Sequence, residues 1–163
     1  MEEQFLHSIA EHQGIIHKVC RIYRDTPEDR DDLFQEIVYQ LWKAFPAFRG
    51  QSAVSTWMYR IALSVAIAKY RKKDRAASTV SLETARAVPL PTAEEHPKQE
   101  LLYQAIARLS DAEKAIITLY LDSHSYQEIA EIIGITTNHV GVKLNRIKQK
   151  LIHQLNPQNY ETG

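Results

Sequence analysis

A helix start, a glycine stop and a second helix start follow one another between residues 125 and 136. Ser125 and Glu128 have the spacing of a capping box, in which each side chain bonds the backbone amide of the other residue. Gly134 stands where a helix needs a left-handed residue at its end, and Thr136 can cap the next helix. This spacing predicts a short helix, a tight corner and a long helix, which is the layout of a helix-turn-helix. The two predicted helices are 126–133 and 137–155.

The predicted last helix has two different faces. An apolar stripe, spaced four, three and four residues apart, consists of Val140, Leu144, Ile147 and Leu151 and is expected to pack inside. The opposite side carries Asn, Gln and Arg side chains, whose donors and acceptors match adenine and guanine edges, and a valine that can touch a thymine methyl. A helix-turn-helix lays such a helix in the major groove of DNA; an amphipathic helix in a plain bundle is the alternative. The far-side residues are Asn138, Val142, Asn145, Arg146 and Gln149, flanked by Lys143, Lys148 and Lys150 as phosphate contacts.

The composition and periodicity predict an all-α chain with two small domains. Only 5 of the 163 residues are glycine, Ala, Leu, Glu and Lys are abundant, and the alternation typical of strands is nearly absent. Residues 1–75 are predicted to form one domain and residues 98–163 the other. The stretch 76–97 has no visible period and is interrupted by prolines, which is typical of an exposed linker. The predicted helices are 3–24, 27–45, 53–74, 98–109, 111–122, 126–133 and 137–155.

Apolar residues at helical spacing predict the buried faces of the first three helices. The first stripe is Phe5, Ile9, Ile16, Val19 and Tyr23. The second is Leu33, Ile37, Val38, Leu41 and Phe45. The third is Met58, Ile61, Ala62 and Val65.

Charged side chains are unevenly distributed, although the formal net charge is zero. Residues 69–75 carry five basic side chains and one acidic, and residues 136–153 carry four basic and none acidic. Residues 25–36 hold six acidic side chains and one basic. Separate basic and acidic surfaces indicate two kinds of partner, and solvated helix faces are the alternative explanation.

Other features exclude several classes of protein. The single cysteine, Cys20, permits no disulfide within the chain and no multi-cysteine metal site, and its apolar neighbours indicate a buried side chain. The first residues lack a signal-peptide pattern, and the apolar stretch 61–68 is too short to span a bilayer, so we expect a cytoplasmic protein. Neither a Gly-rich phosphate loop nor a paired-carboxylate pocket is visible. We therefore expect no enzymatic activity, no cofactor and no bound metal.

Three sequence blocks follow one another in order. They are DDLFQEIVYQLWK at 31–43, FRGQS and TWMYRIA within 48–62, and LS, SYQEIA and GI within 109–135. With these blocks, the chain resembles the small, two-domain extracytoplasmic-function group of bacterial sigma factors. The resemblance covers nearly everything outside the linker. It implies a protein that directs core RNA polymerase to promoter DNA.

The resemblance gives the first block the role of docking on the clamp of the largest polymerase subunit. The implied contacts are Asp32, Gln35, Glu36 and Tyr39. A helical wheel puts Asp32, Glu36 and Tyr39 opposite the predicted inner stripe, whereas Gln35 is closer to its edge. A solvated acidic face is the alternative for these residues.

The resemblance gives the second block the role of capturing and melting the −10 promoter element. Extruding a base costs about a few kcal/mol and needs a preformed pocket with stacking and polar contacts. Aromatic residues beside basic ones are the usual equipment for binding single strands, although core packing is an equal alternative for Trp57. The implied contacts are Phe48, Arg49, Gln51, Ser52, Trp57, Tyr59 and Arg60, followed along the DNA backbone by Lys69, Arg71, Lys72 and Lys73.

The resemblance gives the third block the role of reading the −35 duplex. The implied contacts are Thr136, Asn138, His139, Gly141, Val142, Lys143, Asn145 and Arg146. This chain departs from the family at Gly141, where a basic residue is usual, and at Val142, where a small polar one is usual. It also has Leu63 and Ser64 where a basic residue and Asn are frequent. Because glycine removes a contact and weakens the helix, we expect an uncommon −35 sequence.

The resemblance also implies an anti-sigma factor as a partner, a monomer when free, and no membrane insertion. Three other classes stay open. A conventional helix-turn-helix regulator with an N-terminal dimerisation or ligand domain would bind a palindrome without polymerase. An interaction module whose helix-turn-helix has lost DNA binding is the second alternative, because Gly141 lacks the side chain that would contact DNA. An enzyme is the third, although His7, His12 and His17 are five apart, off the helical register of a shared ligand set.

Overall fold

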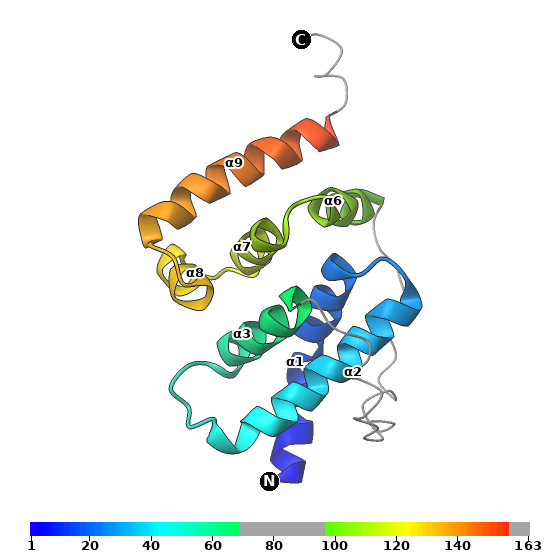
Figure 1. Ribbon diagram of the computed structural model, residues 1–163, viewed down its shortest axis with the longest axis vertical. Helices are drawn as coiled ribbons and strands as arrows, with labels where there is room; N and C mark the ends of the chain where they lie inside the picture. The colour runs from blue at the N-terminus through cyan, green and yellow to red at the C-terminus, as the bar shows by residue number, and fades with distance from the viewer. Residues whose placement is uncertain (69–96, 157–163) are drawn as a thin grey trace. The chain divides into compact units, whose positions relative to one another are not determined.

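The computed structural model describes residues 1–68 and 97–156, and these residues form helices and no strand (Figure 1). The predicted all-α class is confirmed for them. The chain divides into two compact units, Met1–Pro91 and Thr92–Gly163. The predicted linker 76–97 and the basic run 69–75 fall outside the described residues, apart from Pro97. In the part of the chain that is described, no helix combines the length and apolar character needed to cross a bilayer.

Within residues 1–68, the first unit has three α-helices that all pack on one another. They are α1 (Glu2–Tyr23), α2 (Pro27–Ala44), which continues into the 3₁₀ turn η1 (Phe45–Ala47), and α3 (Val54–Ile67). The start of α2 is the one that its sequence predicts, because the Thr26 hydroxyl accepts the N–H of Asp29 at 3.1 Å and Pro27 occupies the first turn. α1 is kinked at His12, whose backbone leaves the helical range.

The core of the first unit follows the predicted stripes of α1 and α2 and, except for Ile61, that of α3. All five predicted α1 residues are buried, and so are the α2 residues except Phe45, which is half-buried. On α3 the buried face is wider than the predicted stripe: Ile61 is half-exposed, while Tyr59, Leu63 and Ala66 are buried in addition to the other predicted residues. Apolar side chains lie nearly all round this helix, so spacing alone could not select the inner face.

The third helix is shorter than predicted. It ends at Ile67, because Ala68 has an extended backbone with ψ of 121°. The sequence pattern predicts an end at Asp74 instead, after the basic stretch 69–73. Arg24, just after α1, donates from Nη1 to the carbonyl of Tyr23 at 2.9 Å and to that of Ala66 at 3.4 Å. A cationic side chain therefore lies at the negative end of α3.

The second unit consists of α6 (Pro97–Ala107), α7 (Asp111–Leu121), α8 (Tyr126–Ile133) and α9 (Thr137–Leu155). The predicted bounds of α8 and α9 are confirmed, and those of the two earlier helices agree within two residues. Ser125 and Glu128 form the predicted capping box. Gly134 ends α8 with a left-handed φ of 87°, and Thr136 caps α9 by accepting the N–H of His139 at 3.1 Å.

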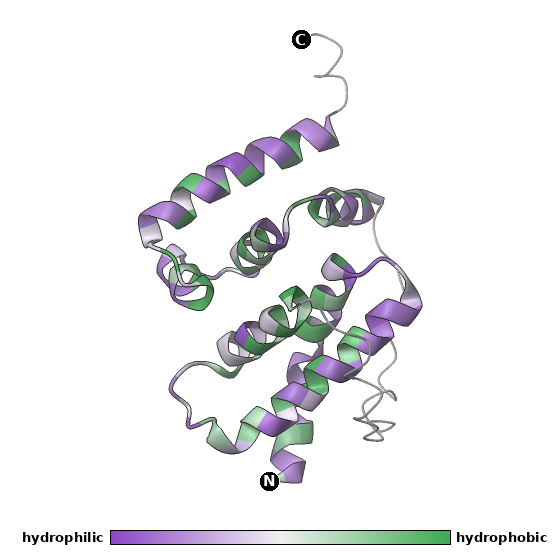
Figure 2. Ribbon diagram, viewed as in Figure 1, coloured by the Kyte–Doolittle hydropathy of each residue, from purple (hydrophilic) through white to green (hydrophobic). Residues whose placement is uncertain are grey.

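The long helix α9 organises the second unit, since it packs on α6, α7 and α8. Its predicted stripe of Val140, Leu144, Ile147 and Leu151 is buried. Hydrophilic and hydrophobic stretches alternate along α9 in Figure 2, as expected for a helix that buries one narrow side. The stripe therefore decides which side chains of α9 face outward.

Candidate nucleic-acid interface

The outer face of α9, defined here as Asn138, Val142, Asn145 and Arg146, is exposed. These side chains lie opposite the buried stripe, on the helix that a helix-turn-helix presents to the major groove. Thr136 and His139 at the start of the helix are exposed as well, and Lys143 is half-buried beside them. The structure thus brings together on one helix the side chains expected to touch −35 DNA.

Gly141 lies at the edge of this face, beneath the ring of Tyr126 from α8. A Cβ atom built at Gly141 would lie 3.5 Å from Cε2 of Tyr126, which is ordinary van der Waals contact. Tyr126 itself is 39% exposed. The missing side chain is therefore partly replaced by an aromatic ring from the neighbouring helix. The sequence pattern does not predict this contact, because Tyr126 and Gly141 lie on different helices and meet only in the folded unit.

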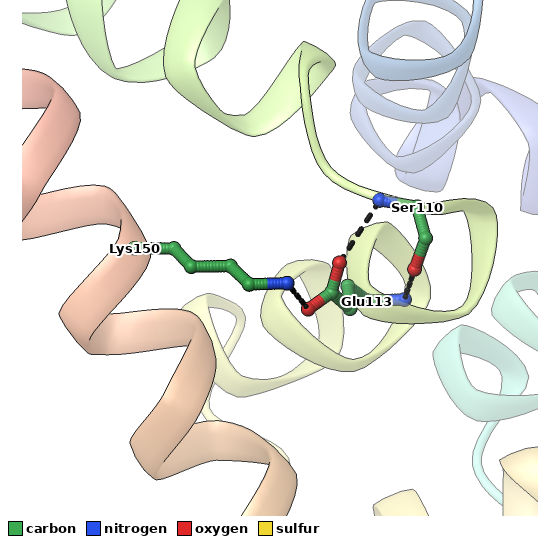
Figure 3. A network of polar contacts seen from close by, with 3 residues as sticks. All are labelled: Ser110, Glu113 and Lys150. Carbon is green, nitrogen blue, oxygen red and sulfur yellow. Dashed lines mark hydrogen bonds and ion pairs between the residues drawn. The ribbon is translucent and has the colours of Figure 1, made fainter.

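Two lysines expected at DNA phosphates bond to α7. Nζ of Lys148 donates to the Tyr120 hydroxyl at 3.0 Å and lies 4.4 Å from the centre of that ring. The hydrogen bond to Tyr120 raises the pKa of Lys148. Nζ of Lys150 lies 2.7 Å from Oε2 of Glu113 (Figure 3). Each lysine thus helps to hold α9 against α7, and its contact with DNA phosphates stays a prediction.

The loop 48–52 between η1 and α3 is organised by its own residues. Gly50 has a φ of 74°, a conformation that favours glycine. The side-chain oxygen of Gln51 accepts the N–H of Arg49 at 3.0 Å. The ring of Phe48 lies 4.8 Å from that of Trp57 at an interplanar angle of 30°. The hydrogen bond to Gln51 and the ring contact of Phe48 therefore hold a turn on which Arg49 is exposed. Ser52, at the end of the loop, is half-buried.

The three α3 residues expected at the −10 strand separate into two groups. Arg60 is exposed and Trp57 is half-buried, so both reach the surface beside the loop. Tyr59 is fully buried, and its expected place on the DNA surface is wrong. The reason is that the inner face of α3 is wider than the predicted stripe and includes Tyr59. Four other expected contacts lie outside the described residues: Lys69, Arg71, Lys72 and Lys73.

The acidic face of α2 carries the residues expected to contact polymerase. Asp32 is exposed, whereas Gln35, Glu36 and Tyr39 are half-buried. Glu36 accepts a hydrogen bond from Nε2 of Gln40 at 3.0 Å. Neighbours on the helix therefore orient parts of this face, which combines acidic, amide and phenolic groups.

The arrangement of metal-ligating side chains and the surroundings of the single cysteine bear on metal binding and catalysis. Among them, no three His, Cys, Asp or Glu side chains gather as metal ligands. Burial raises the pKa of the Cys20 thiol to about 12, and this outweighs the opposite effect of nearby Arg24 and Arg30. A thiol with that pKa is protonated near neutral pH and is a poor nucleophile.

Comparison with known proteins matches each unit to a sigma factor region. Residues 9–76 match sigma-70 region 2, and residues 99–151 match sigma-70 region 4. The RNA polymerase sigma factor YlaC of Bacillus subtilis is 30% identical, over 76% of each chain. The ECF sigma-E factor of Escherichia coli K12 is 29% identical, over 86% of this chain and 82% of its own.

A solved structure has the same fold. The sigma factor RpoE of Bartonella quintana, in complex with the anti-sigma factor NepR, aligns with a TM-score of 0.70 and 18% identity, over 94% of this chain and 98% of its own. The matched regions and relatives do not favour the conventional regulator considered above. With a region 2 unit, a region 4 unit and curated relatives spanning most of its length, the chain belongs to the extracytoplasmic-function sigma factors.

Proposed function

We propose that this sigma factor divides promoter recognition between its two units, with α9 reading the −35 duplex and the loop 48–52 holding the −10 strand. The observation that carries this proposal is the outer face of α9. Its amide and guanidinium side chains are exposed opposite a completely buried stripe. Each well-placed base contact from such side chains contributes about 1–3 kcal/mol of discrimination.

Gly141 and Val142 make part of the proposed reading surface apolar. A basic side chain at position 141 would supply a phosphate contact, whereas this chain presents the Tyr126 ring there. Val142 is 45% exposed and suits a thymine methyl group. We therefore expect the preferred −35 sequence to contain a thymine opposite Val142.

In the proposed melting step, the loop 48–52 and the exposed side of α3 stabilise unpaired DNA. The turn is already formed by Gly50 and by the hydrogen bond from Arg49 to Gln51, so little order has to be created on binding. Arg49 and Arg60 supply positive charge, and Trp57 and Phe48 supply ring surface. The protein makes and breaks no covalent bond; it exchanges base stacking for its own contacts while polymerase supplies the chemistry.

The proposed polymerase contact is the acidic face of α2, at Asp32, Gln35, Glu36 and Tyr39. Because promoter DNA and polymerase meet in the bacterial cytoplasm, we propose that this sigma factor acts in the cytoplasm. An anti-sigma factor that covers one or both surfaces is a proposed regulator. The solved relatives support this partner, since one of them is a sigma factor bound to NepR and another is CnrH bound to the cytosolic domain of CnrY.

Binding to purified core polymerase tests the polymerase contact. The double variant Asp32→Ala, Glu36→Ala should weaken association with core at least tenfold, because two charged groups leave one interface. The matched control is Glu28→Ala, an exposed carboxylate in the first turn of the same helix, which should bind as the unchanged protein does. Equal affinity for the double variant and the control would contradict the proposed contact.

A further inference from the structure

Five aromatic side chains of the first unit form a continuous row of ring contacts. The Phe5 ring meets the Trp42 ring edge-on, with centroids 5.0 Å apart, and meets the Phe45 ring edge-on at 5.4 Å. Phe45 then lies 6.1 Å from Trp57, and Trp57 lies 4.8 Å from Phe48. The row joins the first turns of α1, the end of α2, η1 and the start of α3.

Phe45 ties this row to the loop in two ways. Its backbone carbonyl accepts the N–H of Phe48 at 3.0 Å. Its ring contacts Trp57, which in turn lies against the Phe48 ring. A change at Phe45 therefore reaches Phe48 through the backbone and through the rings.

Phe5 holds Phe45 from the other side. Only 4% of Phe5 is exposed, and it is the one ring of the row that lies on α1. Its two ring contacts are edge-on. The energy of such a contact depends on the relative orientation of the two rings, whereas the energy of apolar burial does not. A side chain of similar size without a ring would keep the burial and lose the orientation.

We infer that Phe5 is a positioning residue for the −10 contact: it fixes Phe45, and through Phe45 and Trp57 it fixes the Phe48 ring. The inference rests on the proposed role of the loop 48–52. Phe5 itself touches no DNA in this account. Its effect is confined to unpaired −10 DNA, because the −35 surface lies on the other unit.

The two tryptophans of the chain provide a direct signal. Both Trp42 and Trp57 belong to the aromatic row, and the chain has no other tryptophan. In a Trp42→Phe background, tryptophan emission of the free chain, measured without polymerase, comes from Trp57 alone. A shift of that emission therefore reports a change beside Phe48.

The test compares Phe5→Leu with Ile9→Val in holoenzyme assembled with core polymerase. Ile9 is the matched control, since it is 5% exposed on the same helix, one turn later. The DNA probes are a single-stranded −10 oligonucleotide and a −35 duplex, both from a promoter that the holoenzyme transcribes. Phe5→Leu should lower affinity for the single strand roughly 5- to 10-fold and shift the Trp57 emission. It should leave affinity for core and for the −35 duplex within about twofold, as Ile9→Val should for all three partners.

Two further variants make the outcome decisive. Phe5→Tyr keeps a ring and should keep the affinity for single-stranded DNA. A role in folding alone would lower the stability of Phe5→Leu but leave the affinity of the folded variant unchanged. Phe48→Leu tests the loop directly. Loss of single-strand affinity in Phe48→Leu but not in Phe5→Leu would overturn the inference and leave the proposed function standing. Unchanged affinity in both variants would overturn the proposed −10 role and the inference with it.

Discussion

Glu113 and Lys150 join α7 to α9: Nζ of Lys150 lies 2.7 Å from one carboxylate oxygen of Glu113, while the other oxygen accepts the N–H of Ser110 at 3.0 Å (Figure 3). Burial opposes the charge on Glu113, but the bonds from Lys150 and Ser110 outweigh it and lower the pKa of this carboxyl. One side chain thus completes a capping box and bonds α7 to α9.

Removing Glu113 should destabilise the second unit more than removing its partner. We expect Glu113→Ala to cost about 1–2 kcal/mol, because it loses both the side-chain bond to the N–H of Ser110 and the ion pair with Lys150. Lys150→Gln loses only the pair and should cost less than about 1 kcal/mol. Thermal unfolding followed by circular dichroism measures both, with tryptophan fluorescence as an internal control for the first unit, where both tryptophans lie. Equal decreases in the free energy of unfolding of the two variants would show that the bond between the N–H of Ser110 and Glu113 contributes nothing.

The two glycines of the helix-turn-helix should respond oppositely to alanine. Gly141→Ala places a Cβ at ordinary contact distance from Tyr126 and should stabilise the second unit by roughly 0.5–1 kcal/mol, through helix propensity. Gly134→Ala puts a side chain on a residue with φ of 87° and should destabilise it by about 1–2 kcal/mol. Chemical denaturation followed by circular dichroism compares them. A destabilising Gly141→Ala would mean that the ring of Tyr126 cannot accommodate a methyl group.

Stability of the first unit should fall in mild acid because of His17. Burial lowers the pKa of His17, whose ring stacks on Phe34 with centroids 4.8 Å apart. Below the unfolded value of 6.5, the unfolded chain binds a proton at this histidine before the folded chain does, so stability decreases as the pH falls. Fluorescence-detected urea midpoints at pH 7.5 and about pH 5.5 should differ less in His17→Leu than in the unchanged protein. His7→Gln, which changes an exposed histidine, should keep the full difference.

If α9 reads bases, two variants of its outer face should lose affinity for the −35 duplex. Arg146→Ala and Asn145→Ala should each lower holoenzyme affinity for the −35 duplex by the equivalent of about 1–3 kcal/mol. Ile152→Ala is the control on the same helix, since this residue is 55% exposed in the last turn and outside the outer face of α9. Footprinting with and without core polymerase measures the change. Unaltered promoter occupancy in both variants would support a module that has lost DNA contact.

Local signals were enough to predict most of the second unit. The capping box at Ser125, the stop at Gly134 and the cap at Thr136 each act within a few residues, so spacing revealed them directly. The stripe of α9 was equally readable, because polar side chains occupy most of the rest of that helix. The predicted fold and the outer face of α9 follow from these features.

Contacts between distant residues could not be read in the same way. Tyr59 was misplaced because α3 is apolar on almost every side, so its inner face is decided by packing against α1 and α2. The bonds of Lys148 and Lys150 to α7 were not predicted, because the sequence does not show that Tyr120 and Glu113 lie within their reach. The Tyr126–Gly141 contact and the row beginning at Phe5 depend likewise on tertiary structure.

Transcription in vitro with purified core polymerase on a pool of genomic fragments tests the account most directly. We expect transcripts with discrete start sites that appear only when this chain is added. Those transcripts should disappear when Phe48→Leu is combined with Arg146→Ala. Failure of the chain to associate with bacterial core polymerase, or the same transcripts from the double variant, would contradict the account.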